Sequence, residues 1–290
     1  MNAVYKKELK SYFTGMTGAI FVGFILLIAG IYTVVYNLRG LYPNFEYVLS
    51  GVSFIYLLTV PVLTMRSFAE EKHSKTDQLL YSLPISVTSV VMAKYLAMLT
   101  VLLIPCAVMA FYPLILCMFG TVHLTGAYAA LLAFFLLGAS LISIGMFVSS
   151  LTESQVISAV ISLLALILIN FMSGLSGMYP TSSAASLAGL VVLSIVVGII
   201  VQVLIKNSVV SACTSVVLIA ASVLVYLVNS SLLEGLMPRL LSSLSLFDRI
   251  TSFQSGIFDM TAVVFYISVC ALFVYLTCLL YTSDAADEED

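Results

Sequence analysis

The sequence predicts an all-α, polytopic helical membrane protein with about eight transmembrane helices. Of its 290 residues, 62% are hydrophobic and only 9% are charged, whereas a soluble domain carries about a quarter charged residues. Several long stretches contain no charged residue, and a bilayer core requires about 20 apolar residues per helix. The composition excludes a soluble enzyme, a disordered protein and a nucleic-acid-binding protein, which would need a basic face.

Charged and polar residues mark the ends of eight apolar segments. We expect spans at 16–36, 47–65, 96–119, 127–150, 155–173, 187–205, 209–229 and 259–277. Pro61 predicts a kink in the second span, because proline removes a backbone donor. Residues 230–258 form an external amphipathic segment before the last span, and its aromatic residues favour packing at the membrane interface.

The positions of lysine and arginine predict the orientation. If the N-terminus is cytoplasmic, the outside segments hold only Arg39, Arg239 and Arg249. The inside segments then hold Lys6, Lys7, Lys10, Arg66, Lys72, Lys75, Lys94 and Lys206. This distribution satisfies the positive-inside rule. We therefore expect a multi-pass protein with both termini in the cytoplasm.

The predicted spans lack residues that carry chemistry. No ionisable residue lies in any of them away from its ends, which disfavours an ion-coupled carrier. The five cysteines have no metal-binding or disulfide spacing, and His123 lies in a predicted external turn. The sequence thus predicts no catalytic residue, no cofactor and no metal site in this chain.

The first fourteen residues predict an amphipathic helix that lies in the membrane interface. One face is aromatic and apolar, and the other carries lysines that suit anionic lipid. The residues concerned are Tyr5, Lys6, Lys7, Leu9, Lys10, Tyr12 and Phe13. The alternative is a basic flank that only obeys the positive-inside rule.

The loop at 66–94 is the only long charged segment on the predicted inside. Two i,i+4 pairs, Arg66 with Glu70 and Glu71 with Lys75, predict a helix. That helix ends on an apolar edge, a proline breaks it, and Ser86 or Thr88 can cap the next helix. The edge and the break are Leu79, Leu80, Leu83 and Pro84. The segment is either a solvated link or a docking helix for a cytoplasmic partner.

The last thirteen residues differ in composition from the rest of the chain. Five of the fourteen acidic residues lie after position 283. Residues 278–290 resemble a translated sequencing-library adapter, in which case the natural C-terminus would be missing. The alternative is an ordinary acidic tail. We exclude 278–290 from functional reasoning.

Four motifs together resemble ABC-2-type transporter permeases, nearest to the bacterial gliding-motility-like or multicopper-enzyme-maturation-like permease subunits. They are Tyr5-Lys-Lys-Glu-Leu-Lys-Ser-Tyr-Phe13, the loop from Arg66 to Lys94, Ser149-Ser-Leu-Thr-Glu-Ser-Gln155 and Ser252-Phe-Gln-Ser-Gly-Ile-Phe-Asp259. The resemblance covers residues 1–277, the expected transmembrane permease domain. It implies an ABC-2-like six-helix core, to which the spans at 187–229 add an inserted pair. The adapter-like run replaces the short basic tail typical of such permeases.

The resemblance implies the permease subunit of an ATP-binding cassette transporter in the bacterial cytoplasmic (inner) membrane, an exporter of unidentified substrate. An ABC ATP-binding subunit and a second permease copy or paralogue would be its partners, besides membrane lipid. This chain has no GxxxxGK[ST] motif, so ATP and Mg would bind to the partner subunit. The implied ATPase-coupling loop comprises Arg66, Glu70, Glu71, Lys72, Thr76, Leu79, Leu80, Leu83 and Pro84. The alternative is a non-transporting membrane scaffold or assembly protein, which would have no need of such a loop.

Overall fold

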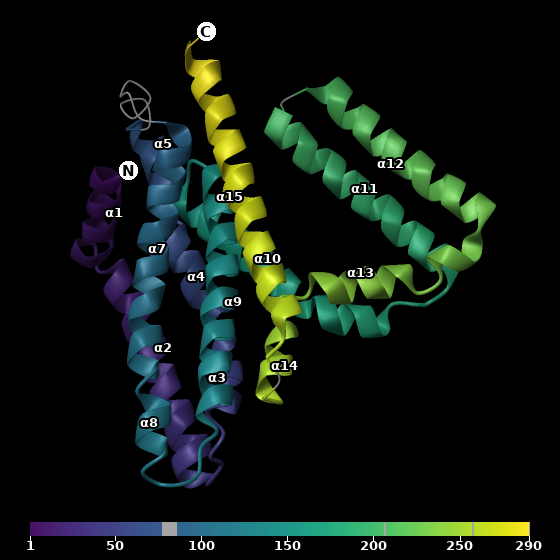
Figure 1. Cartoon of the computed structure of the whole chain (residues 1–290). Helices are drawn as coiled ribbons and strands as arrows, with labels where there is room; N and C mark the ends of the chain where they lie inside the picture. Colours follow the sequence, from purple (N-terminus) through teal and green to yellow (C-terminus); the bar gives the residue numbers. More distant parts are fainter. Residues whose placement is uncertain (77–85, 206, 257, 290) are drawn as a thin grey trace. The chain divides into compact units, whose positions relative to one another are not determined.

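A computed structural model describes residues 1–76, 86–205, 207–256 and 258–289 (Figure 1), and this part of the chain contains helices but no strand. Its first half contains α1 (Asn2–Thr14), α2 (Thr17–Tyr32), the π-helix η1 (Thr33–Arg39), α3 (Phe45–Ser53), α4 (Tyr56–Thr64), α5 (Ala69–Ser74), α7 (Val87–Met109), α8 (Tyr112–Leu116) and α9 (Leu124–Ser150). The second half contains α10 (Gln155–Met178), α11 (Ser183–Ile205), α12 (Ser208–Val228), the 3-10 helix η2 (Ser230–Leu233), α13 (Leu236–Leu244), α14 (Arg249–Gln254) and α15 (Met260–Glu289).

The described helices confirm an all-α polytopic membrane protein. Seven are long and apolar enough to cross a bilayer, and an eighth span results if the bent pair α3–α4 is counted as one. Helices suit this environment because they satisfy their own backbone hydrogen bonds without water. Ser86 occupies the N-cap position of α7, as one of the two predicted candidates, but its side chain makes no capping hydrogen bond to the backbone and lies 2.7 Å from the Ser89 hydroxyl.

The second span is bent at a different place from the one predicted. The chain turns by 55° between α3 and α4, at Phe54–Ile55, whereas Pro61 lies inside α4. The backbone N–H groups of Leu57 and Leu58 bond to carbonyls only three residues back, at 3.1 Å each. Pro61 has no N–H to bond to Leu57. This tightened turn lies one to two turns before the proline, next to the bend at Phe54–Ile55.

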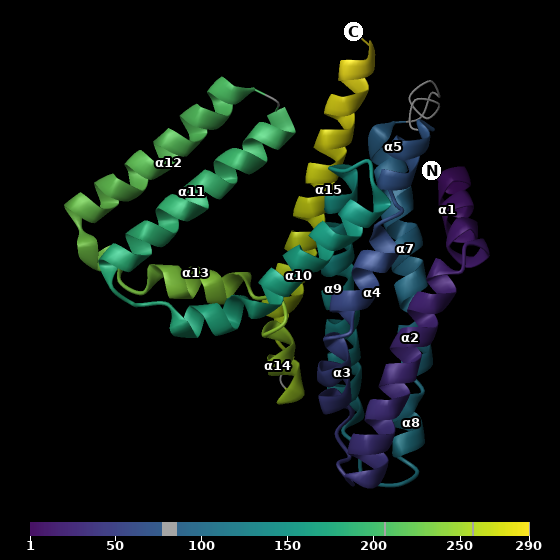
Figure 2. The same ribbon diagram turned by 180° about the vertical axis from the view of Figure 1, so that it is seen from behind.

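Helix α9 is the centre of the bundle. About 78% of its most apolar stretch is buried, far more than in the six other unbroken spans. Small residues on α9 let its neighbours approach closely, as is typical of membrane helices. At Gly145 an added Cβ would lie 2.5 Å from the Thr64 hydroxyl of α4, so no larger residue fits there. Figure 2 shows α2 beside α4, on which it packs.

The chain divides into two compact units, residues 1–167 with 246–290, and residues 168–245. In the second unit α11 and α12 pack side by side, and these are the helices predicted as an inserted pair. Asn207 caps α12, because its side-chain oxygen accepts hydrogen bonds from the backbone of Val209 and Val210 at 3.0 and 3.4 Å. Most side chains of α12 are exposed, since only 6% of its most apolar stretch is buried.

In the first unit, α14 belongs to the aromatic segment at 247–260. Ile250 and Phe253 are buried, and Phe253 meets Phe258 edge to face at 5.9 Å. Helix α14 packs against α3 and α9. The aromatic residues thus serve packing, the role that the sequence favoured for them.

Candidate functional site

The segment from Arg66 to Thr76 is fixed to the end of α9 by one serine hydroxyl. Ser149 Oγ accepts hydrogen bonds from the backbone N–H groups of Phe68 and Ala69, both at 3.2 Å. It also lies 3.3 Å from the Met65 carbonyl oxygen, to which it donates. No local side chain caps α5, so a residue of another helix satisfies the donors that a helix N-terminus leaves free.

A second link joins α5 to the same end of α9. The Lys72 ammonium donates a hydrogen bond to the Ser150 carbonyl oxygen at 2.6 Å. Lysine near the C-terminus of a helix interacts favourably with the partial negative charge of its last carbonyls. Together, Lys72 and Ser149 hold α5 in a fixed position on the membrane domain.

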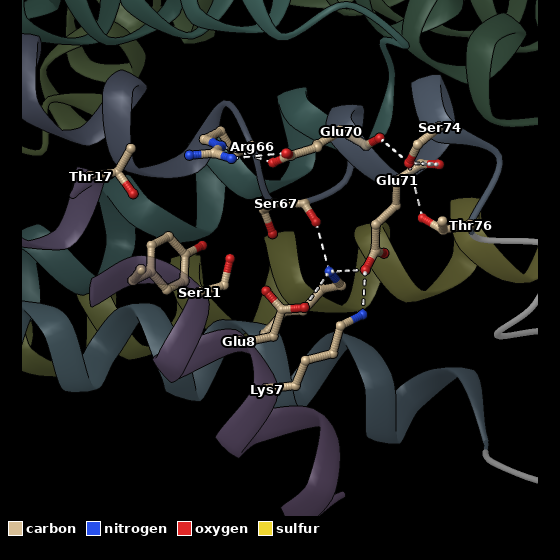
Figure 3. Close-up of a pocket in the computed structure, with 12 residues that line it drawn as sticks. Lys7, Glu8, Ser11, Thr17, Arg66, Ser67, Glu70, Glu71, Ser74 and Thr76 are labelled. Carbon is tan, nitrogen blue, oxygen red and sulfur yellow. Dashed lines mark hydrogen bonds and ion pairs between the residues drawn. The ribbon is translucent and has the colours of Figure 1, made fainter. Parts of the chain in front are cut away.

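The most buried charge of the described chain lies between α1, α5 and α7. Lys94 of α7 is only 1% exposed. Its ammonium lies 2.9 Å from Glu71 Oε1 and 3.1 Å from Glu8 Oε1, and it donates to the Ser67 carbonyl oxygen at 2.8 Å. An ammonium has three N–H donors, and here each has an oxygen. Figure 3 shows Glu8 and Glu71 directed toward each other across this cluster.

Further contacts surround this cluster. The Lys94 ammonium lies 5.1 Å from the centroid of the Phe68 ring, within the range of a cation–π interaction. The exposed Lys7 of α1 approaches Glu71 at 4.0 Å. The two carboxylates are 12% exposed each, so the cluster is almost dehydrated. Buried charges of this kind are tolerated only when they are paired.

A predicted pair within the loop is confirmed, and another is not. Arg66 donates two hydrogen bonds to the Glu70 carboxylate, both at 2.8 Å. These bonds lower the pKa of Glu70 and raise that of Arg66, although partial burial opposes both shifts. Glu71 pairs with Lys94 and Lys7, not with Lys75. Lys75 adopts the left-handed conformation (φ 53°) that ends α5, so the helical i,i+4 geometry stops before it.

The loop and α1 enclose a polar cavity of about 250 Å³. Its walls include Ser11 of α1, Thr17 of α2, Ser74 at the end of α5 and Thr76 after it (Figure 3). Tyr12 of α1 also lines the cavity. Burial raises the pKa of the Tyr12 phenol above its usual range. Among the described residues no group of three His, Cys, Asp or Glu side chains could hold a metal ion.

The predicted interfacial helix is helical over its whole length and packs along one side on α7. Val4 packs against Val90 and Ala93, and Tyr5 bonds through its hydroxyl to Thr100 at 2.9 Å. Lys6, Lys7, Lys10 and Phe13 are exposed, Tyr5 and Leu9 are half-buried, and Tyr12 is buried. Contact of this helix with lipid stays a prediction.

The structure describes five of the nine predicted coupling residues. Leu79, Leu80, Leu83 and Pro84 lie outside the described residues. Sequence reasoning did not select Glu8 as a site residue and used Lys94 only as the end of the loop. A signal was present in both cases: Glu8 is the only acid among the lysines of α1, and Lys94 is followed by a long uncharged run.

A family model for the ABC-2 family transporter protein matches residues 39–281, which is most of the chain. This match covers the loop, α9 and the described spans after the first, apart from the last residue of the eighth, and it begins at Arg39, where the first span ends. Searches of curated proteins and of solved structures found no significant match. The chain therefore belongs to the ABC-2 family of membrane transporter proteins.

Proposed function

We propose that this ABC-2 permease subunit is driven by a separate ATP-binding subunit that docks on residues 66–86. The docking subunit binds ATP and Mg and hydrolyses ATP, and two copies of each subunit form the working transporter. The transporter exports its substrate. The alternative function, a non-transporting scaffold, gives no reason for a loop that is attached so firmly to two spans, α7 and α9, and to α1.

One observation carries this proposal: buried polar contacts join α5 to α1, α7 and α9. Glu71 joins it to α7 through Lys94, and Lys94 joins both to α1 through Glu8. Ser149 joins it to α9, the central helix. A force on α5 is therefore passed to the spans, because these bonds are short, buried and mutually supporting.

The proposed location is the bacterial inner membrane, with α1, α5 and the C-terminal end of α15 on the cytoplasmic side. These three parts lie at one end of the first unit in both Figure 1 and Figure 2. The lysines of α1 and of the loop are at this end, as the positive-inside rule requires. The coupling loop would then face the compartment that supplies ATP.

The docking role can be tested by co-purification with the ATP-binding cassette protein encoded beside this gene. Leu79→Ala with Leu80→Ala should weaken binding, because each buried anchor lost at an interface costs about 1–4 kcal/mol. The matched control is Leu232→Ala with Leu244→Ala, since both leucines are exposed and lie in the other unit. Glu70→Ala should change the salt dependence of binding more than its strength.

The result that supports docking is loss of the ATPase from the loop variant and retention by the control, with equal membrane insertion of both. If the loop variant and the control retain the ATPase equally, Leu79 and Leu80 do not take part in the docking interface. A gene neighbourhood without any ATP-binding cassette protein would favour the scaffold function.

A further inference from the structure

A second polar cavity lies at the opposite end of the first unit from α5. It has a volume of about 440 Å³ and forms where the starts of α3 and α9 meet the end of α14. Its walls include Asn44, Glu46, Tyr47, His123, Thr125 and Gln254. Among the described residues, no lysine or arginine lines it. The family resemblance assigns nothing to this cavity, and in Figure 1 α3 and α14 lie at the other end of the first unit from α1 and α5.

Glu46 is the unusual residue in this cavity. It is only 5% exposed, and its Oε2 atom is buried without a hydrogen-bond partner among the described residues. A buried carboxylate that lacks a partner is costly, because it has lost its hydration and gained nothing in return. Glu46 lies in the first turn of α3, where a negative charge favours the helix dipole. That benefit does not require burial, since an exposed glutamate would provide it too.

The neighbouring backbone leaves room for this carboxylate. A Cβ atom at Gly126, in the first turn of α9, would lie 2.5 Å from Glu46 Oε1. A larger residue at this position would push the carboxylate away, so the glycine leaves room for the carboxylate where it now lies. The cavity is therefore lined by one carboxylate and, among the described residues, by no lysine or arginine that could neutralise it.

The other groups in the cavity match a ligand with several N–H donors. Asn44 and Gln254 offer amide oxygens, and Thr125 offers a hydroxyl oxygen. A primary ammonium group has three donors and one positive charge, which would satisfy Glu46 and two of these oxygens. A divalent metal ion suits the cavity less well, because hard cations prefer several carboxylates and Glu46 is the only one that lines it. A sugar would supply donors but would leave the charge uncompensated.

We propose that this cavity binds a small organic ammonium ion, with Glu46 as its charge partner. The proposal concerns binding by this chain alone and does not depend on the docking of an ATPase. Its failure and the failure of the proposed function are therefore separate outcomes.

Equilibrium dialysis with radiolabelled n-propylammonium tests the proposal on the full chain in nanodiscs. The wild type should bind saturably at one ion per chain. Glu46→Gln keeps the shape and removes the charge, and should weaken binding at least about tenfold. The matched control is Glu234→Gln, the same change at an exposed glutamate of the other unit, and should leave the affinity unchanged.

Two further arms keep the test independent of folding in the variants. On the wild type, the uncharged analogue 1-propanol should not compete with n-propylammonium, and neither should glucose. Gly126→Ala should also reduce affinity by displacing the carboxylate. The proposal is overturned by absence of saturable binding, by equal affinity of wild type and Glu46→Gln, or by equally strong competition from 1-propanol or glucose.

Discussion

The two ends of the first unit each bury carboxylates, but in opposite ways. At one end Glu8 and Glu71 share the ammonium of Lys94, and all three N–H donors of that ammonium have an oxygen. Glu71 Oε2 has no hydrogen-bond partner among the described residues, but Glu71 Oε1 is ion-paired with Lys94. At the other end Glu46 is 5% exposed, its Oε2 also lacks a partner, and no described cation forms an ion pair with this carboxylate. A paired charge can hold helices together, whereas an unpaired buried carboxylate can still accept a cation or a hydrogen-bond donor. The first end therefore holds three helices together through charge, and the second is the end at which we propose that a cation binds.

The largest expected effect is at Lys94. Lys94→Met leaves two carboxylates buried without a cation, and we expect a loss of about 3–5 kcal/mol in the free energy of unfolding. Reversible unfolding in mixed micelles would measure it. The triple variant Lys94→Met, Glu8→Gln, Glu71→Gln should recover most of the loss, because it removes the charges together. If Lys94→Met alone is as stable as the wild type, Lys94 does not hold these helices together.

A smaller effect is expected at Ser149. Ser149→Ala removes the group that accepts from two backbone N–H groups at the start of α5, and loss of a helix cap costs about 0.5–2 kcal/mol. Ser140→Ala is the matched control in the same helix, since its buried hydroxyl bonds only to the Leu137 carbonyl of its own helix, at 2.8 Å. Faster proteolysis within 66–76 should appear in the Ser149 variant alone. Equal protection in both variants would mean that α5 is held by other contacts.

Glu46→Gln and Glu71→Gln compare the two buried carboxylates directly. Because no partner is lost in Glu46→Gln and the cost of burying an unpaired charge is removed, we expect the free energy of unfolding to fall by no more than about 1 kcal/mol, the size of the helix-dipole contribution, and it can rise. Glu71→Gln, a change of the same atoms, should cost clearly more. The two variants can be compared in the same unfolding assay. Equal losses would show that Glu46 has a structural role like that of Glu71.

The smallest effect concerns acid pH and Arg66. The pKa of Glu70 is lowered by the hydrogen bonds from Arg66, so the pair stabilises the fold at pH values above the unfolded pKa of about 4.3. This contribution is lost as the pH falls through the lowered folded pKa. Both side chains are partly exposed, and such pairs contribute only about 0–1 kcal/mol. The melting temperature of Glu70→Gln should therefore fall less between pH 5 and pH 3 than that of the wild type, as a titration series would show.

The sequence predicted the parts of this molecule that depend on local pattern. The spans follow from uncharged apolar runs, and the Arg66–Glu70 pair follows from helical spacing. The Lys94 cluster depends on Glu8 and Glu71 arriving from two other helices, and Glu8 is 86 residues away in sequence. Helical spacing predicted an ion pair between Glu71 and Lys75. In the structure Lys75 ends the helix in the left-handed conformation, and Glu71 pairs with Lys94. The sequence predicted the bend of the second span at Pro61, but the structure has it at Phe54–Ile55, beside a turn whose backbone N–H groups bond to carbonyls three residues back.

The burial of Glu46 lay beyond sequence reasoning for the same reason. Its position in the first turn of a helix is ordinary, and its pocket is completed by Gly126 and by residues 254–256 from distant parts of the chain. The resemblance to ABC-2 permeases was carried by four separate motifs, and the family match over residues 39–281 confirms it.

The central claim is that this chain is moved by a separate ATPase through α5 and Lys94. ATP turnover in nanodiscs tests it most directly, with the neighbouring ATP-binding cassette protein measured alone, with the wild-type chain and with Lys94→Met. We predict no turnover by this chain alone and a raised turnover of the complex. The complex with the Lys94 variant should bind the ATPase but lose most of that increase. Turnover by this chain alone, or full stimulation by Lys94→Met, would contradict the account.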